Sequence, residues 1–238
     1  VEFACIMNGL GVKTTLIYRG KRILKNFDQD LTNLLQEEMI KKKIDIKFNT
    51  NIEDIFEAKE GLEIKVQQGP SIKSECILSA LGRSPNVNKL NLDRTGVKQK
   101  KNGAIIVDEF SKTNIDNIYA IGDVTDRINL TPVAIREGHA FADSEFGNKK
   151  RSASHKNVPS TVFTDPPLST VGMTTEEADK LGYKVKIFKT QFSPMKYTFA
   201  NTKPKILMKL LVDDKTDKIL GIHMLGQDSP EIIQSLAI

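Results

Sequence analysis

The stretch NIYAIGDVTDRINLTPVAIREGHAFADSEFGN, residues 117–148, decides the fold. It opens with a short apolar run at residues 118–121, which predicts a buried parallel strand that ends at Gly122-Asp123. Ligands of open α/β folds bind at this edge of the sheet, where glycine permits a close approach and aspartate accepts hydrogen bonds. Thr131-Pro132 then predicts a helix start, with threonine as the N-cap. The positive end of that helix suits a ligand that becomes anionic.

The composition is that of a globular chain with a small excess of positive charge. Its 238 residues are 39% hydrophobic and 27% charged, with a net charge of +5. The apolar runs are too short to span a membrane, and the basic clusters at residues 41–43 and 149–151 are interpreted as solvated ends of elements. Neither a membrane nor a nucleic acid is therefore expected as a partner.

The two cysteines, Cys5 and Cys76, lie far apart and form no C-x-x-C pattern. This spacing argues against a disulfide framework and against a zinc site, so no metal is expected. It fits a reducing compartment, and we expect a cytoplasmic protein.

A dinucleotide site is predicted near the start of the chain. Residues 1–8 predict a helix and residues 11–19 a β-branched strand, which together form the second half of a βαβ unit. An NAD site has an acidic residue at the end of this strand, whereas this chain has Arg19, followed by Lys25. Because guanidinium binds phosphate with two hydrogen bonds and lysine adds a charge, the pattern indicates NADPH. The alternative is that these cations only solvate a loop.

Local patterns predict the elements that follow. An amphipathic helix is expected over residues 28–42, with one apolar face made by Leu31, Leu34, Leu35 and Met39. A hairpin or meander is expected over residues 52–76. The predicted strands are residues 44–48, 62–66, 76–81 and 104–107. The turn GRSPN at residues 82–86 follows the third of them.

The chain changes character after a basic, serine-rich linker at residues 149–157. Thr174 and Glu177 have the spacing of a capping box, which predicts a short helix. Strands are predicted at residues 158–163, 184–188, 206–212 and 219–225. This part is therefore expected to be an α+β layer with antiparallel strands.

Residues 117–134 resemble the second FAD-binding motif of the pyridine nucleotide-disulfide oxidoreductases. The runs VGMT (171–174), FSPM (192–195) and GIHM (221–224) resemble the interface domain of that family. The Ser-Pro-Met run and the basic 2′-phosphate site are similar to the glutathione reductase branch rather than to dihydrolipoamide dehydrogenases. The resemblance covers the whole chain.

The resemblance implies an α/β fold with Rossmann-like FAD/NAD(P)-binding domains and an α+β dimerisation domain. Residues 1–85 would be the NADPH-binding domain without its start. Residues 86–150 would be the returning part of the FAD-binding domain, and residues 151–238 the dimerisation domain without its end. Both ends look cut, so we expect a fragment of a homodimeric enzyme.

The resemblance also implies FAD and NADPH as cofactors and assigns residues to them. Asp123 would hold the ribityl and phosphate side of FAD, and Glu2 would lie near the nicotinamide. The full set of cofactor positions is Glu2, Arg19, Lys25, Gly82, Gly122, Asp123, Thr131 and Val162. Leu130 and His139 would contact the substrate, His139 where some members of the family have an arginine for a glutathione carboxylate. The alternative for His139 is a solvated helix face.

The implied activity is the NADPH-dependent reduction of glutathione disulfide. The family uses a Cys-x4-Cys disulfide and a His-Pro with a downstream Glu, and the sequence contains neither. We therefore assign no catalytic residue here: Cys5 and Cys76 are expected to be buried thiols, His155 to be exposed, and His223 has no proline after it. The chain alone is expected to be inert and to hold FAD weakly. The alternatives are a trypanothione-type or dihydrolipoamide dehydrogenase-like reductase, or a non-catalytic nucleotide-binding or dimerisation module.

Overall fold

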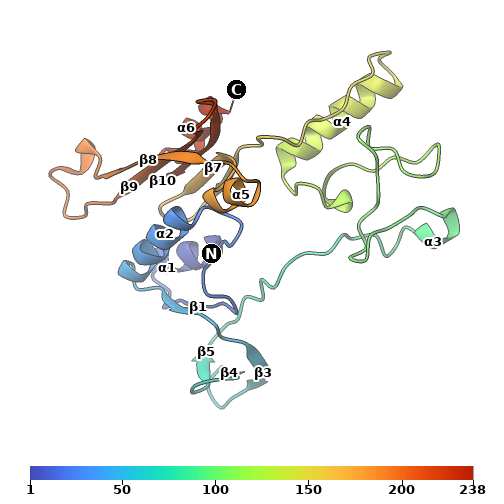
Figure 1. Cartoon of the computed structure of the whole chain (residues 1–238). Coiled ribbons are helices and arrows are strands. Elements are labelled where there is room, and N and C mark those ends of the chain that lie inside the picture. Colours follow the sequence, from blue (N-terminus) through green and yellow to red (C-terminus); the bar gives the residue numbers. More distant parts are fainter. Residues whose placement is uncertain (238) are drawn as a thin grey trace. The chain divides into compact units, whose positions relative to one another are not determined.

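The computed structural model describes residues 1–237, which form two compact units (Figure 1). Unit 1 combines residues 1–77 with the residues from 157 onward, and unit 2 contains residues 78–156. Unit 1 therefore joins two segments that are far apart in the sequence.

The first segment of unit 1 contains part of a parallel sheet and its helices. Its elements are α1 (Glu2–Gly9), β1 (Thr15–Ile17), α2 (Gln29–Lys41) and β2 (Asp45–Lys47). β1 and β2 pair in parallel, with Leu16 opposite Ile46. The expected strands are thus present but shorter than predicted. The predicted face of α2 is confirmed, since all four of its apolar side chains are buried.

A three-stranded antiparallel meander follows, made of β3 (Ile52–Glu57), β4 (Leu62–Val66) and β5 (Ile72–Ser74). The meander confirms the prediction for residues 52–76. The strand predicted at residues 76–81 is wrong, because Leu78 and Leu81 are 63% and 91% exposed and the described residues supply no strand beside them. A strand needs a neighbour to take its backbone hydrogen bonds.

The second segment of unit 1 is a five-stranded antiparallel sheet in the order β6-β7-β10-β9-β8. Its strands are β6 (Ser160–Val162), β7 (Leu168–Gly172), β8 (Val185–Phe192), β9 (Ile206–Asp213) and β10 (Ile219–Leu225). The four predicted strands are confirmed, and β7 is an additional one. Three short helices accompany the sheet: α5 (Thr175–Lys180), η2 (Met195–Tyr197) and α6 (Ser229–Leu236). Both hydrogen bonds of the predicted Thr174–Glu177 capping box are present.

One hydrophobic core joins the two segments of unit 1. Leu31, Leu35 and Met39 of α2 belong to the same buried cluster as Leu168 and Leu225 of the antiparallel sheet. α2 packs on β10, and Figure 1 shows this helix beside the sheet. Helix α2 and its core are thus packed on a sheet that begins more than a hundred residues further along the chain.

Unit 2 contains three helical segments and little strand. These are α3 (Leu92–Thr95), the 3-10 turn η1 (Gly122–Thr125) and α4 (Thr131–Glu145). The strands predicted at residues 104–107 and 118–121 are wrong, because each run forms only one isolated bridge, Gln99–Ile105 and Lys112–Tyr119. Their backbone amides bond to irregular segments rather than to a strand, since Ile105 N donates to Val124 O and Ala120 N to Ser111 O.

The start of α4 differs from the prediction by one residue. Leu130 rather than Thr131 is the N-cap, and it makes no side-chain capping bond. Its carbonyl accepts hydrogen bonds from the amides of Val133 and Ala134. Pro132 falls inside the first turn, where a missing amide hydrogen costs nothing.

Candidate functional site

The Gly122-Asp123 turn in unit 2 is the candidate FAD contact. Gly122 is buried with φ +69°, and a Cβ added there would lie 3.1 Å from the Cβ of Ala134. Both the backbone angle and the close approach of α4 require glycine at this position. Asp123 is exposed at the tip of the turn.

A buried carboxylate of α4 lies behind this turn. Glu137 Oε2 accepts a hydrogen bond from Gly122 N at 2.6 Å, and Glu137 Oε1 lies 2.9 Å from Arg127 Nη2 and 2.6 Å from His155 Nε2. The Glu137 side chain is only 1% exposed. Burial opposes its ionisation, but the Gly122 amide, His155 and Arg127 outweigh burial and lower its pKa. Glu137 is therefore an ionised anchor for the turn.

The Glu137 cluster was not predicted from the sequence. His155 was expected to be exposed, and this is wrong, because its ring is half-buried against Glu137. A usable signal exists: Glu137 lies four residues after Val133 and three before Ala140, on the one buried stripe of α4. A charged residue on an apolar stripe indicates a buried partner.

A cleft of about 220 Å³ opens beside Asp123. It is lined by Arg83, Ser84, Pro85, Asn86, Asp123, Val124, Asp126 and Asn129. The structure therefore brings Asp123 together with the segment that follows Gly82, although about forty residues separate them. Arginine, amide and carboxylate groups in one cleft suit the hydroxyl and phosphate groups of a nucleotide.

The other predicted positions of unit 2 do not line this cleft. Leu130 and Thr131 form the start of α4, and His139 is exposed further along the same helix. Gly82 has φ +132°, which favours glycine, and directly precedes the lining residue Arg83.

Two predicted cofactor positions, Glu2 and Val162, meet in unit 1. Glu2 Oε1 accepts a hydrogen bond from Phe163 N at 2.8 Å, across 161 positions of sequence. Val162 directly precedes Phe163 at the end of β6. The first turn of α1 is thereby tied to the edge of the antiparallel sheet, so that Glu2 and Val162 are brought together.

The candidate 2′-phosphate loop, residues 19–27, leads from β1 towards α2. Arg19, Lys21 and Lys25 are exposed. Arg22 differs from them, because its Nη1 pairs with Glu176 Oε1 of α5 at 2.9 Å and its Nη2 donates to Lys25 O at 3.0 Å. Arg22 is engaged within the protein, whereas the other three cations face solvent.

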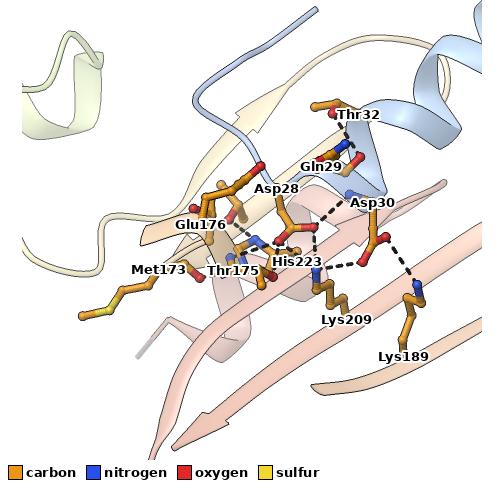
Figure 2. Close-up of polar contacts among 12 residues, drawn as sticks. Asp28, Gln29, Asp30, Thr32, Met173, Thr175, Glu176, Lys189, Lys209 and His223 are labelled. Carbon is orange, nitrogen blue, oxygen red and sulfur yellow. Dashed lines mark hydrogen bonds and ion pairs between the residues drawn. The ribbon is translucent and has the colours of Figure 1, made fainter. Parts of the chain in front are cut away.

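The loop ends at a buried ionic network, shown in Figure 2. Lys209 Nζ of β9 donates to Asp28 Oδ1 and to Asp30 Oδ2, each at 2.8 Å, and Thr175 Oγ1 donates to Asp28 Oδ2 at 2.8 Å. Burial opposes the charge of both Asp28 and Lys209. The hydrogen bonds from Lys209 and Thr175 nevertheless lower the pKa of Asp28, and those to Asp28 and Asp30 raise the pKa of Lys209.

The remaining reactive side chains are His223 and the two cysteines, and none of them belongs to the sites described above. His223 is fully buried, with its Nδ1 on Thr170 Oγ1 and its Nε2 on Met173 O. Both cysteines are free; Cys5 is buried as predicted, but Cys76 is exposed, so the prediction for Cys76 is wrong. Residue 76 lies after the end of β5, and the strand that was expected to bury it does not form.

No three His, Cys, Asp or Glu side chains of residues 1–237 gather in a way that could hold a metal ion. No helix among the same residues combines the length and apolar character needed to cross a bilayer.

Comparison with known proteins places the chain in a family. The family model described as pyridine nucleotide-disulphide oxidoreductase matches residues 1–138, and the model of its dimerisation domain matches residues 158–238. The chain is 48% identical to a glutathione reductase of Nostoc sp. over 252 aligned residues, which cover all of this chain and 55% of that protein. It is 42% identical to a trypanothione reductase of Trypanosoma congolense, covering all of this chain and 49% of that protein.

A solved structure agrees with this placement. The HOCl-induced flavoprotein disulfide reductase RclA of Escherichia coli matches with a TM-score of 0.90 and 29% identity, over 99% of this chain and 54% of that one. The chain thus spans about half the length of the relatives it matches. The predicted fold class, Rossmann-like nucleotide-binding domains with an α+β dimerisation domain, is confirmed. The chain belongs to the pyridine nucleotide-disulphide oxidoreductase family.

Proposed function

We propose that the protein to which this chain belongs is an NADPH-dependent, FAD-containing reductase of glutathione disulfide. One observation carries the proposal: a relative named glutathione reductase aligns with every residue of the chain at 48% identity. A second glutathione reductase, from Burkholderia cepacia, is 39% identical over the whole chain and 53% of its own length. The trypanothione reductase relative, at 42%, supports the nearest alternative substrate.

NADPH suits the residues of unit 1. Arg19 and Lys25 are exposed on the loop after β1, where a 2′-phosphate needs cations and an NAD site needs an acid. Glu2 and Val162 lie together through the hydrogen bond of Glu2 to Phe163 N, and we assign them to the nicotinamide end. Gly82, which belongs to unit 2 and has φ +132°, remains a predicted backbone contact with the dinucleotide.

FAD suits the residues of unit 2. Asp123 would accept hydrogen bonds from ribityl hydroxyls in the cleft that it shares with Arg83 and Asn86. Gly122 keeps the backbone close to α4, and Thr131 begins that helix, whose positive end favours negative charge on a ligand. When bound, FAD would supply the transfer of reducing equivalents from NADPH to a disulfide.

The remaining assignments are part of the same proposal. Residues 1–85 would serve NADPH, residues 86–150 would return to the FAD domain, and residues 151–238 would pair two subunits in a homodimer. Leu130 and His139, at the start and on the exposed side of α4, would contact glutathione disulfide. A cytoplasmic location is consistent with the two unpaired cysteines.

The test is a substrate comparison on protein expressed from its complete coding sequence. NADPH oxidation is measured with glutathione disulfide, trypanothione disulfide and lipoamide at equal concentrations. We expect the highest kcat/KM with glutathione disulfide. A higher kcat/KM with trypanothione disulfide would identify trypanothione disulfide as the substrate instead. No oxidation with any disulfide would favour a non-catalytic nucleotide-binding or dimerisation module.

A further inference from the structure

The 2′-phosphate loop, residues 19–27, is held by side chains that lie more than 140 residues further along the chain. Arg22 provides the first anchor, because its guanidinium bridges Glu176 Oε1 at 2.9 Å and Lys25 O at 3.0 Å. The Arg22 side chain is 20% exposed and that of Glu176 38%, so the bridge is partly shielded from water. The backbone of Lys25 is thereby tied to helix α5.

The second anchor lies at Asp28, the residue that follows the loop and caps α2. Its carboxylate is fully buried, and both of its oxygens are occupied. Oδ1 accepts from Lys209 Nζ and from Asp30 N, while Oδ2 accepts from Lys209 Nζ and from Thr175 (Figure 2). Glu176 is the next residue after Thr175, so α5 contacts the loop region at both anchors.

We propose that Glu176 is a positioning residue for the recognition of the dinucleotide 2′-phosphate. It engages Arg22, and Arg22 fixes the backbone of Lys25. The exposed cations Arg19, Lys21 and Lys25 are then presented on one ordered loop and lose less conformational entropy when they bind phosphate. This inference deepens the proposed NADPH specificity and rests on it. It assigns Arg22 to the support of the loop rather than to the phosphate.

A positioning role and a simple charge effect predict opposite results. Glu176 is an anion beside a cationic loop, so Coulomb's law alone predicts tighter binding of a phosphate once its charge is removed. If Glu176 instead orders the loop, its removal weakens phosphate binding in spite of the lost negative charge. The sign of the change therefore separates the two roles.

Asp179 provides the matched control. It is an exposed acid on the same helix, α5, and its side chain makes no hydrogen bond or ion pair within residues 1–237. Asp179→Ala removes the same charge from the same element without touching the loop. Glu176→Gln is the conservative variant, because its amide oxygen can still accept a hydrogen bond from Arg22.

The experiment measures binding of 2′,5′-ADP and of 5′-AMP by calorimetry to the protein expressed from its complete coding sequence. We expect Glu176→Ala to weaken 2′,5′-ADP binding about fivefold, the upper range for a partly exposed ion pair, and to leave 5′-AMP binding unchanged. Glu176→Gln should lose less affinity for 2′,5′-ADP than Glu176→Ala does. Asp179→Ala should bind 2′,5′-ADP as tightly as the wild type or more tightly. The positioning role alone would be overturned if the wild type prefers 2′,5′-ADP to 5′-AMP but Glu176→Ala binds 2′,5′-ADP as tightly as the wild type or more tightly. Equal wild-type affinity for the two ligands would overturn the NADPH assignment and the positioning role together.

Discussion

The backbone amide of Gly122 donates a 2.6 Å hydrogen bond to the buried carboxylate of Glu137, fifteen residues further along the chain. The bond fixes the turn that presents Asp123, and it does so from the helix whose start we assign to FAD. The same carboxylate holds Arg127, which in turn bonds Ser111 and Thr125. One side chain therefore supports the turn that we assign to FAD and the loops around it.

Replacing Glu137 with alanine should destabilise the protein. The change leaves the Gly122 amide without its acceptor and Arg127 and His155 without their anionic partner, at a cost of about 2 kcal/mol of unfolding free energy. Urea unfolding followed by circular dichroism measures it. Glu109, an exposed acid of the same unit, provides the control, and Glu109→Ala should change stability by less than about 0.5 kcal/mol. Equal effects of the two variants would contradict the anchoring role.

Alanine should lower the unfolding free energy at one of two glycines near this turn and not at the other. Gly122→Ala places a side chain at φ +69°, 3.1 Å from Ala134 Cβ, and should lower the unfolding free energy by more than about 1 kcal/mol. Gly138 lies within α4, and its added Cβ would meet only the end of the Ile121 side chain, at 3.4 Å. Gly138→Ala should therefore be neutral or stabilising, by up to about 1 kcal/mol. Thermal unfolding of both variants checks the pair, and a tolerated Gly122→Ala would count against the turn geometry.

Removing only one charge of the Asp28–Lys209 pair should lower the unfolding free energy far more than expected from the effect of removing both charges. Lys209→Met leaves a fully buried carboxylate without its main cation and should lower the unfolding free energy by about 3 kcal/mol. Adding Asp28→Asn removes the stranded charge, so the double variant should be more stable than the sum of the single changes predicts. Denaturant unfolding of all four proteins of this cycle gives the coupling free energy. A coupling near zero would mean that the pair does not stabilise unit 1.

His223 should make folding sensitive to mild acid. Burial lowers the pKa of this imidazole below its usual 6.5 in the folded protein. The unfolded chain therefore binds more protons than the folded one below about pH 6.5, so stability falls as the pH decreases through this range. His223→Gln should remove that part of the pH dependence.

The control for His223 is the exposed His139. Urea unfolding at pH 7.5 and pH 5.5 should show the same loss of stability in His139→Gln as in the wild type. A pH dependence that disappears with His139 but persists without His223 would refute this assignment.

The sequence predicts best what is determined locally. The buried face of α2 and the capping box of α5 follow from spacing within a single helix. The strands β8, β9 and β10 follow from their apolar runs, and they pair with one another as neighbours in sequence. The pattern that identifies each of these elements is local, although the face of α2 packs on the distant β10.

The failures share one cause, which is dependence on distant partners. The apolar runs at residues 76–81, 104–107 and 118–121 look like strands, but the described residues give none of them a neighbouring strand. Lys209 lies in a strand with an apolar pattern, and its partner Asp28 is 181 positions away. No local pattern reports such a contact, although a lysine among buried positions indicates that a buried acid must exist.

The most direct test of the account compares NADPH with NADH as the reductant of glutathione disulfide, in protein expressed from its complete coding sequence. Because Arg19 and Lys25 are free to bind a 2′-phosphate, kcat/KM should be higher for NADPH by about tenfold or more. Replacing both residues with alanine should reduce that ratio while leaving the rate with NADH unchanged. Equal kcat/KM values for the two reductants in the wild type would contradict the account.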